Sequence, residues 1–194
     1  MDPDLKKYQT LVTRMFEIDS PVEFSNGQPS HAAIIFAEML RRAKSHVLIF
    51  CKELAKEVFD GDRDIIPALR SALERNVDVS IIVQEKPQSL EFVRHATDFL
   101  NDRLLPGEVS VIECGQGTQP IKDIELNFAV MDQKAVRVEF DKGKVEAVAC
   151  ANNPRMAKTL TTHFRGIQRF LQDVGTSINH LDGQSALDAQ GVRS

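Results

Sequence analysis

The sequence lacks the features that mark secreted and membrane proteins. It contains only three cysteines in 194 residues, and their spacing is not paired. An odd, unpaired set suits a reducing compartment better than a disulfide framework. No apolar run approaches the ~20 residues that span a bilayer, and the first residues are charged instead of forming an apolar signal core. These absences predict a cytoplasmic protein with reduced thiols and no membrane attachment.

The three cysteines leave two interpretations open. Cys51, Cys114 and Cys150 each fall near the downstream end of an apolar, strand-like run. Such ends often meet along one edge of a sheet, so a thiol cluster or a soft-metal site is one interpretation. The other is that each cysteine is a small buried hydrophobic side chain, which is what this residue type favours.

The sequence also lacks a dominant positive charge. Its formal net charge is −4, and no block of lysines and arginines is present. Generic binding to nucleic acid or to an acidic membrane would therefore need a local basic patch. Arg155, Lys158 and Arg165 fall on the last predicted helix, where they form either such a strip or an ordinary solvated face. With 42% hydrophobic residues, the chain can bury the core of one domain.

Helical and extended patterns alternate along the chain. Apolar periodicity predicts helices over residues 5–16, 31–44, 64–75, 88–105 and 154–171. Strand-like runs fall at residues 46–51, 77–83, 108–113, 126–131, 135–140 and 145–150. Turn residues at 132–134 and 141–144 predict two hairpins among the last three strands. The predicted organisation is an amphipathic helix over residues 1–20, an α/β domain over 21–174 and a flexible tail over 175–194.

The stretch from Glu125 to Asp132 carries the most specific pattern. It is Glu-Leu-Asn-Phe-Ala-Val-Met-Asp on a predicted strand, and Ala-Cys-Ala-Asn follows after the hairpin. This frame resembles the His-x-Lys-x-x-x-x-Asp motif of the phospholipase D superfamily, with its later Gly/Ser-x-Asn element. Aligned on Asp132, the resemblance puts Glu125 at the histidine position and Asn127 at the lysine position. Cys150 and Asn152 fall on the serine and asparagine of the later element.

The order of helices and strands is similar to one repeat of the same superfamily over residues 30–172. The resemblance implies an α/β fold, a phospholipase D-like α-β-α sandwich with a mixed, largely parallel sheet and helices on both faces. Superfamily members with one repeat usually pair two repeats to complete a site. The resemblance therefore also implies a homodimer, or association with a second repeat or another protein partner.

The substitutions within the frame change its chemistry. In the superfamily, the histidine is the nucleophile and the lysine supplies positive charge to the phosphate oxygens. An ionised Glu125 repels a phosphodiester, and Asn127 donates hydrogen bonds without carrying charge. Since the loss of a single oxyanion donor costs roughly 10²–10³-fold in rate, we expect no phosphodiesterase activity of the superfamily type.

The same residues have ordinary structural interpretations. Asp132 suits the start of a hairpin turn. Asn152 and Asn153 suit the cap of the helix that begins at Pro154. A pocket that has lost its chemistry can still be concave, so it can hold a small ligand or a protein segment.

Three functional hypotheses follow. The first is a catalytically degenerate phospholipase D-like domain that acts as an interaction or regulatory subunit. The second is an atypical phosphodiesterase or nuclease that uses Asp123, Glu125 and Asp132 as metal ligands, or His163 as a displaced base. The third is sequence-nonspecific nucleic-acid binding in a retained groove, which the net charge does not favour. The first hypothesis involves no metal and no cofactor, because the five histidines are dispersed and no P-loop or dinucleotide fingerprint is present.

Overall fold

The structure of the protein is a computed structural model that describes residues 2–60, 64–140 and 146–174. Its strands are β1 (Glu23–Asn26), β2 (His46–Cys51), β3 (Asp78–Val83), β4 (Val109–Glu113), β5 (Asn127–Met131), β6 (Ala135–Glu139) and β7 (Ala147–Cys150). Its helices are α1 (Pro3–Glu17), α2 (Pro29–Arg42), α3 (Lys56–Phe59), α4 (Ile65–Glu74), α5 (Leu90–Leu100), α6 (Gln119–Lys122) and α7 (Pro154–Asp173). The turn predicted at 141–144 and the tail predicted at 175–194 lie outside the described residues.

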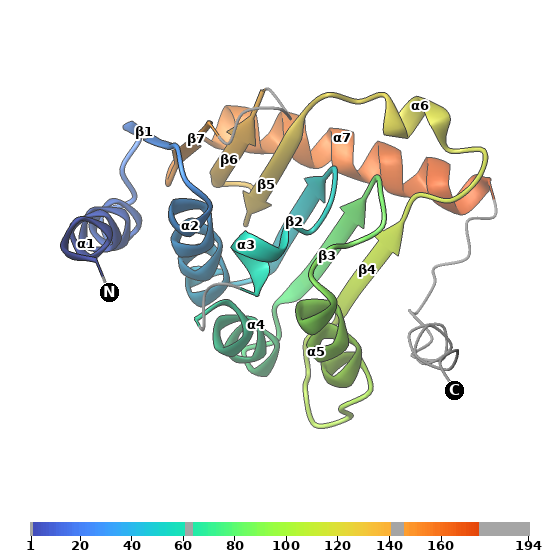
Figure 1. The fold of residues 1–194 in the computed structure, drawn as a ribbon, viewed down its shortest axis with the longest axis horizontal. Coiled ribbons are helices and arrows are strands. Elements are labelled where there is room, and N and C mark those ends of the chain that lie inside the picture. The colour runs from blue at the N-terminus through green and yellow to red at the C-terminus, as the bar shows by residue number, and fades with distance from the viewer. Residues whose placement is uncertain (1, 61–63, 141–145, 175–194) are drawn as a thin grey trace, which may run out of the picture.

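The described strands form one open, mixed sheet in the order β1-β7-β6-β5-β2-β3-β4 (Figure 1). The β2–β3 and β3–β4 pairs are parallel, and helices connect each of them. The β1–β7, β7–β6, β6–β5 and β5–β2 pairs are antiparallel. The predicted α/β class and mixed sheet are confirmed. Most of the described strands run in the same direction, as expected for a largely parallel sheet. Most neighbouring pairs are nevertheless antiparallel, because β5 and β7 run in the opposite direction to the strands beside them.

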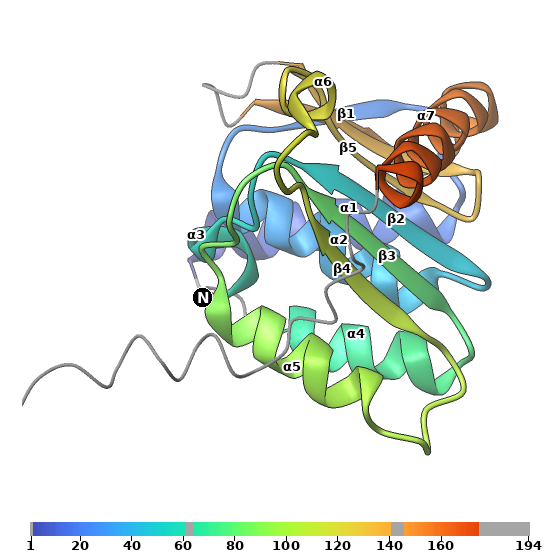
Figure 2. The same ribbon diagram turned by 90° about the vertical axis from the view of Figure 1, so that its right-hand side faces the viewer.

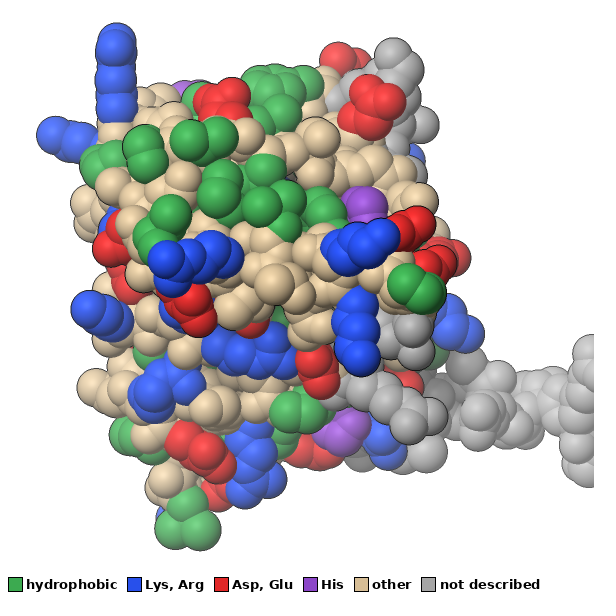
Figure 3. Space-filling model, turned by 90° about the vertical axis from the view of Figure 1, so that its left-hand side faces the viewer, with side chains coloured by type: hydrophobic (Ala, Val, Ile, Leu, Met, Phe, Trp, Pro, Cys, Tyr) green, Lys and Arg blue, Asp and Glu red, His purple; other side chains and the backbone are tan. Residues whose placement is uncertain are grey.

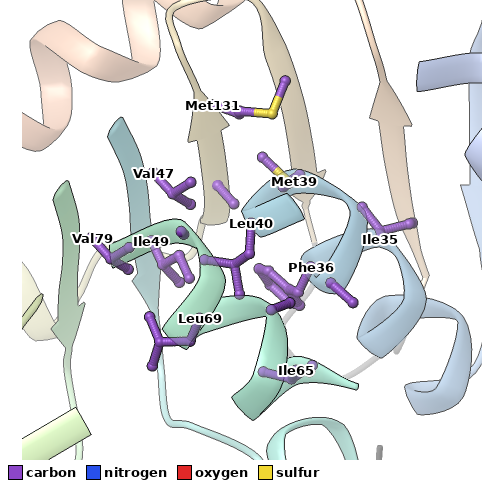
Figure 4. Close-up of a cluster of buried hydrophobic side chains, with 14 of the residues drawn as sticks. Ile35, Phe36, Met39, Leu40, Val47, Ile49, Ile65, Leu69, Val79 and Met131 are labelled. Carbon is purple, nitrogen blue, oxygen red and sulfur yellow. The ribbon is translucent and has the colours of Figure 1, made fainter. Parts of the chain in front are cut away.

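Helices cover both faces of this sheet, and a separate part of the core lies on each face. On one face, α2 and α4 pack against β2, β3 and β5, and Figure 4 shows Phe36, Met39 and Leu40 of α2 directed toward Ile49 and Met131 of the sheet. On the other face, α7 lies along the sheet (Figure 2) and supplies most of the buried helical side chains, together with Ile121 of α6. Among the described residues, no helix combines the length and the apolar character needed to cross a membrane.

The N-terminal helix packs on the same face as α2. Val12 and Phe16 of α1 are buried in that core. The ring of Tyr8 stacks on His31 with 3.8 Å between centroids, and its hydroxyl donates to the Ser25 carbonyl at 3.0 Å. These contacts attach α1 to both α2 and β1. The short strand β1, which the sequence did not predict, pairs with β7 and forms one edge of the sheet.

The parallel and antiparallel halves of the sheet meet between β2 and β5. At this seam the Asp132 carboxylate accepts hydrogen bonds from three consecutive backbone N–H groups, those of Lys44 (2.8 Å), Ser45 (2.9 Å) and His46 (3.1 Å). The Ser45 hydroxyl also donates to it at 2.9 Å. Asp132 and Gln133 both have positive φ, 52° and 53°, as the two central residues of a tight hairpin turn require. Asp132 therefore forms the β5–β6 turn and fastens it to the start of β2.

The hydrogen bonds to Asp132 also set its protonation. Burial raises the pKa of this carboxyl group, but the donated N–H groups of His46, Lys44 and Ser45 outweigh burial and hold the pKa below its ordinary value. Because the ionised form is the one that accepts these bonds, the folded state favours it more than the unfolded state does. These hydrogen bonds, together called the Asp132 clamp, are thus at full strength at neutral pH and weaken as the carboxylate is protonated in acid.

We expect Asp132→Asn to lower the free energy of unfolding by about 2 kcal/mol at pH 7, since hydrogen bonds to a charged acceptor are worth about 1.5–3 kcal/mol. The difference from the wild type should persist above the ordinary aspartate pKa of about 4 and shrink as the pH falls below it. Urea unfolding over a pH series measures both effects.

Glu125→Gln is the matched control, since Glu125 is exposed and forms no hydrogen bond or ion pair within the described parts of the chain. It should leave stability unchanged. A pH-independent loss in Asp132→Asn, or an equal loss in the control, would contradict the clamp.

Candidate functional site

A cavity of about 330 Å³ lies where the end of β2, the start of β5 and the end of β6 meet beneath α2 and α3. Its apolar walls include Phe36 of α2, Ile49 of β2, and Val58 and Phe59 of α3. The polar and charged side chains among its lining residues are Glu53, Glu57, Asn127, Arg137 and Glu139. A mostly apolar hollow with a few convergent polar groups is typical of a binding site.

Asn127, at the start of β5, is hydrogen-bonded to the ends of the two strands that flank β5. Its Oδ1 accepts from the backbone N–H of Lys52 at 2.8 Å, and its Nδ2 donates to Glu139 Oε1 at 3.1 Å. The residue is 8% exposed. Because a buried amide needs such partners, Asn127 acts first as a structural link between β2 and β6.

Arg137 is the buried cation of the site. It is 5% exposed, its Nη2 donates to Glu139 Oε2 at 3.2 Å, and its Cζ lies 5.2 Å from the Phe36 ring centroid. Burial lowers the pKa of Arg137, and the Glu139 carboxylate opposes that effect. Across the sheet, Ala147 and Ala149 of β7 pair with Glu139 and Arg137. Because alanine side chains are small, they leave space on this face of the sheet for the longer side chains of Arg137 and Glu139.

Several buried polar atoms near this end of the sheet lack a hydrogen-bond partner within the described residues. They are Nδ2 and Oδ1 of Asn26, Nδ1 of His31 and Nε of Arg137. Asn26 pairs with Ala147, which in turn pairs with Glu139, so it lies on the same transverse row of the sheet as the ion pair. Arg137 thus lines the cavity while its buried Nε lacks a hydrogen-bond partner among the described residues.

The charges around the cavity are unsuited to a phosphodiester. Three carboxylates, those of Glu53, Glu57 and Glu139, line it against the single guanidinium of Arg137. No histidine, serine or threonine is among the described lining residues, and burial raises the pKa of the one lining thiol, Cys51, to about 12. A thiol with that pKa stays protonated at neutral pH and is a poor nucleophile. The described lining residues therefore provide neither an anion clamp nor an activated nucleophile.

The structure separates Glu125 from this cavity. Glu125 is exposed on the segment between α6 and β5, and it is not a lining residue. Asn127, two residues later, begins β5 and is buried. Glu125 and Asn127 therefore do not share this cavity, because β5 begins only at Asn127 and Glu125 is exposed on the segment before it.

Cys150 and Asn152 are also remote from the cavity. Asn127 pairs with Glu139 at one end of the β5–β6 hairpin, whereas Cys150 pairs with Val136 toward the other end. Cys150 belongs to the core cluster under α7, and thus to the opposite face of the sheet. Asn152 forms no part of the cavity lining. The later element of the sequence frame is therefore not brought together with Asn127.

The helix-capping interpretation is confirmed for the neighbour of Asn152. Asn153 Oδ1 accepts from the backbone N–H of Met156 at 3.1 Å and caps α7. Asp132 likewise has the hairpin-turn role that its structural interpretation predicted. His163 is exposed on α7, across the sheet from the cavity.

The structure does not support a metal centre. Within the described residues, no group of three or more His, Cys, Asp or Glu side chains could hold a metal ion. Asp123 follows α6 and Asp132 lies beyond the far end of β5, so the two carboxylates are separated by the length of that strand. The described cysteines are free thiols that lie on different parts of the sheet and form no cluster.

Sequence analysis missed Arg137 and Glu139. In Val-Arg-Val-Glu the alternation suggests charged side chains on a solvent face, but the charged residues point to the side that α2 and α3 cover. The available signal was the Ala-Val-Ala-Cys strand that follows, because its small residues provide space for long neighbours.

Comparison with known proteins identifies the fold. No family model matches the sequence, and no curated protein matches it. The structure is similar to that of Nuc, a phospholipase D family member from Salmonella typhimurium, with a TM-score of 0.51 and 18% identity over 76% of this chain and 93% of Nuc. It is also similar to the archaeal chromatin protein TrmBL2, with a TM-score of 0.56 and 13% identity over 84% of this chain and 59% of TrmBL2. The protein has a phospholipase D-like fold.

The buried ion pair can be tested by a double-mutant cycle. Arg137→Met leaves the Glu139 carboxylate buried without its partner, so it should lower the free energy of unfolding by about 3–5 kcal/mol. Adding Glu139→Gln removes that charge while keeping an acceptor for Asn127, and should restore at least about 1 kcal/mol. Denaturant unfolding of the two single variants and the double variant gives the coupling energy. Strict additivity would show that the two side chains do not depend on each other.

Proposed function

We propose that this protein with a phospholipase D-like fold is an interaction or regulatory domain that does not hydrolyse phosphodiesters. The observation that carries the proposal is the state of Asn127, which the sequence frame puts at the lysine position. It is buried and hydrogen-bonded to Lys52 N and Glu139 within a cavity that carries more carboxylates than cations. Such a site repels a phosphate group and offers no charge to its developing oxyanion.

The cavity suits a different kind of guest. Its aromatic and aliphatic walls can bury an apolar group, and its acidic lining favours a neutral or cationic one. Arg137 is the one cationic side chain among its described lining residues. We infer that the guest is a small neutral molecule or a side chain of a partner protein. By analogy with single-repeat members of the superfamily, the partner is a second copy of this chain or another phospholipase D-like repeat.

We place this function in the cytoplasm. The three cysteines are free thiols, and burial raises the pKa values of Cys51 and Cys114. Unpaired thiols of this kind persist in a reducing compartment.

Nucleic-acid binding without cleavage is the second candidate function. The structure of TrmBL2 shows a novel mode of DNA binding, so a protein with a similar fold binds DNA. In this chain the favouring observation is the outer surface of α7, where exposed basic side chains have no acidic partner within the described residues. This candidate is compatible with an inactive cavity, since binding to phosphates requires no nucleophile.

We expect no hydrolysis of bis(p-nitrophenyl) phosphate or of single-stranded DNA above the rate of buffer, with or without Mg²⁺ or Mn²⁺. The reason is that the described cavity residues provide neither an activated nucleophile nor a cationic clamp. Release of nitrophenolate and gel analysis of the DNA provide the two readouts.

Glu125→Ala is the diagnostic variant for the competing enzyme hypothesis. If the wild type cleaves either substrate in a metal-dependent way and Glu125→Ala does not, the protein is an atypical phosphodiesterase and the proposal is wrong. Equal, background-level rates for both proteins support it.

A further inference from the structure

The outer face of α7 carries a regular row of positive charge. Arg155, Lys158, Arg165 and Arg169 are all exposed. Together with Thr162 they follow a spacing of three and four residues, so they lie on one side of the helix. At a rise of 1.5 Å per residue, this α7 stripe is about 21 Å long. The only carboxylate of the helix is Asp173, at its last residue.

These charges are not neutralised by neighbouring acids. None of the ion pairs among the described residues includes a side chain of α7. Arg165 donates to the Gln168 side chain and Arg169 to the Arg165 carbonyl, both uncharged acceptors. The face over α1, by contrast, intermingles both signs, as Figure 3 shows, and there Lys7 pairs with Asp4 and Arg14 with Glu17. The α7 stripe therefore concentrates charge of one sign on a chain whose net charge is −4.

We propose that the α7 stripe binds the phosphate backbone of nucleic acid without reading its sequence. Duplex DNA presents one phosphate per 3.4 Å of axis on each strand, so a stripe of about 21 Å faces about six phosphates of one strand. Arginine and lysine are the residues that most often contact phosphate oxygens. Thr159 and Thr162 donate their hydroxyl protons to helix carbonyls, which leaves the cationic side chains as the donors to a ligand.

The surface is less suited to other polyanions. A helix that binds a membrane inserts an apolar face, but the apolar face of α7 is buried against the sheet by Ala157, Leu160, Phe164, Ile167 and Leu171. No apolar side chain is exposed from residue 155 to residue 169. A protein interface of useful affinity has apolar or aromatic anchors at its centre, and this stripe has none. No exposed Phe, Tyr or Trp lies on this stretch, which favours contacts to the phosphate backbone over base stacking.

This inference deepens the second candidate function by assigning it a surface, and it needs no contribution from the cavity. α7 lies on the opposite face of the sheet from α2 and α4, which cover the side of the cavity (Figure 2). A variant of the α7 stripe can therefore be tested without disturbing Asn127 or Arg137.

The test is fluorescence anisotropy of labelled oligothymidine and of a labelled duplex with the full chain across a salt series. Neutralising four phosphates of a single strand predicts a slope of about −2.8 for log affinity against log salt, or roughly a 50-fold loss between 50 and 200 mM. The variant Arg155→Gln/Lys158→Gln/Arg165→Gln/Arg169→Gln should bind at least about tenfold more weakly at low salt and show a slope near zero.

The matched control is Lys6→Gln/Lys56→Gln/Lys86→Gln/Arg103→Gln. These four residues are exposed, belong to no ion pair among the described residues, and their loss also changes the formal net charge from −4 to −8. The control should bind DNA as the wild type does, within about twofold. Circular dichroism of both variants verifies that they retain the helix content of the wild type.

Each other outcome overturns the inference in a recognisable way. Equal losses in both variants would show that only net charge matters. Wild-type binding that neither variant weakens would move the DNA site elsewhere and leave the second candidate function intact. No DNA binding at low salt would remove both. Binding of polyglutamate, or of vesicles of phosphatidylserine and phosphatidylcholine, with affinity equal to that for DNA would make the stripe a general anion or membrane surface.

Discussion

The carboxylate of Asp132 is the constraint on which the arrangement of this sheet depends. The sheet joins a parallel half built from β2, β3 and β4 to an antiparallel half built from β5, β6, β7 and β1, and the two halves share only the β2–β5 pair. At one end of that pair, Asp132 accepts hydrogen bonds from three successive N–H groups that precede and begin β2. Because a strand slipped by one residue turns every side chain to the other face, a clamp at this point fixes the register of the whole antiparallel half.

The register fixed at Asp132 determines which residues lie at the opposite end of the β5–β6 hairpin. Five residues earlier, Asn127 lies between the ends of β2 and β6. It accepts a hydrogen bond from Lys52 N beside β2 and donates one to Glu139 of β6. In the frame that resembles the phospholipase D motif, the aspartate is thus required by the fold whatever the chemistry. The histidine position, exposed Glu125, carries no comparable structural demand, whereas Asn127 at the lysine position links the ends of β2 and β6. A chain can exchange the histidine and the lysine for an exposed glutamate and a buried amide and still build the same sheet.

The elements that sequence analysis predicted are those with a long hydrophobic pattern. Helices α1, α2, α4, α5 and α7 and strands β2 to β7 were predicted because each repeats apolar residues at its own period. The strand β1 was missed since Glu-Phe-Ser-Asn has one apolar residue, and α3 and α6 were missed since four residues show no period. At the site, Asn127 was identified from its place in the frame. Its partners Arg137 and Glu139 were not, because inward charges on a strand are recognisable only once the small residues beside them in space are known.

The two faces of the sheet carry charges of opposite sign. Once the sheet is in place, the cavity on one face is lined by Glu53, Glu57 and Glu139, while the helix on the other face presents Arg155, Lys158, Arg165 and Arg169. Charges of opposite sign that are separated by a packed sheet do not neutralise each other as adjacent ion pairs do. The two proposed preferences, that of the cavity for a neutral or cationic guest and that of α7 for phosphate, are therefore compatible in one molecule. A phosphodiester chain bound to α7 as proposed would lie across the sheet from Asn127 and Arg137, so the proposed nucleic-acid surface is separate from the cavity.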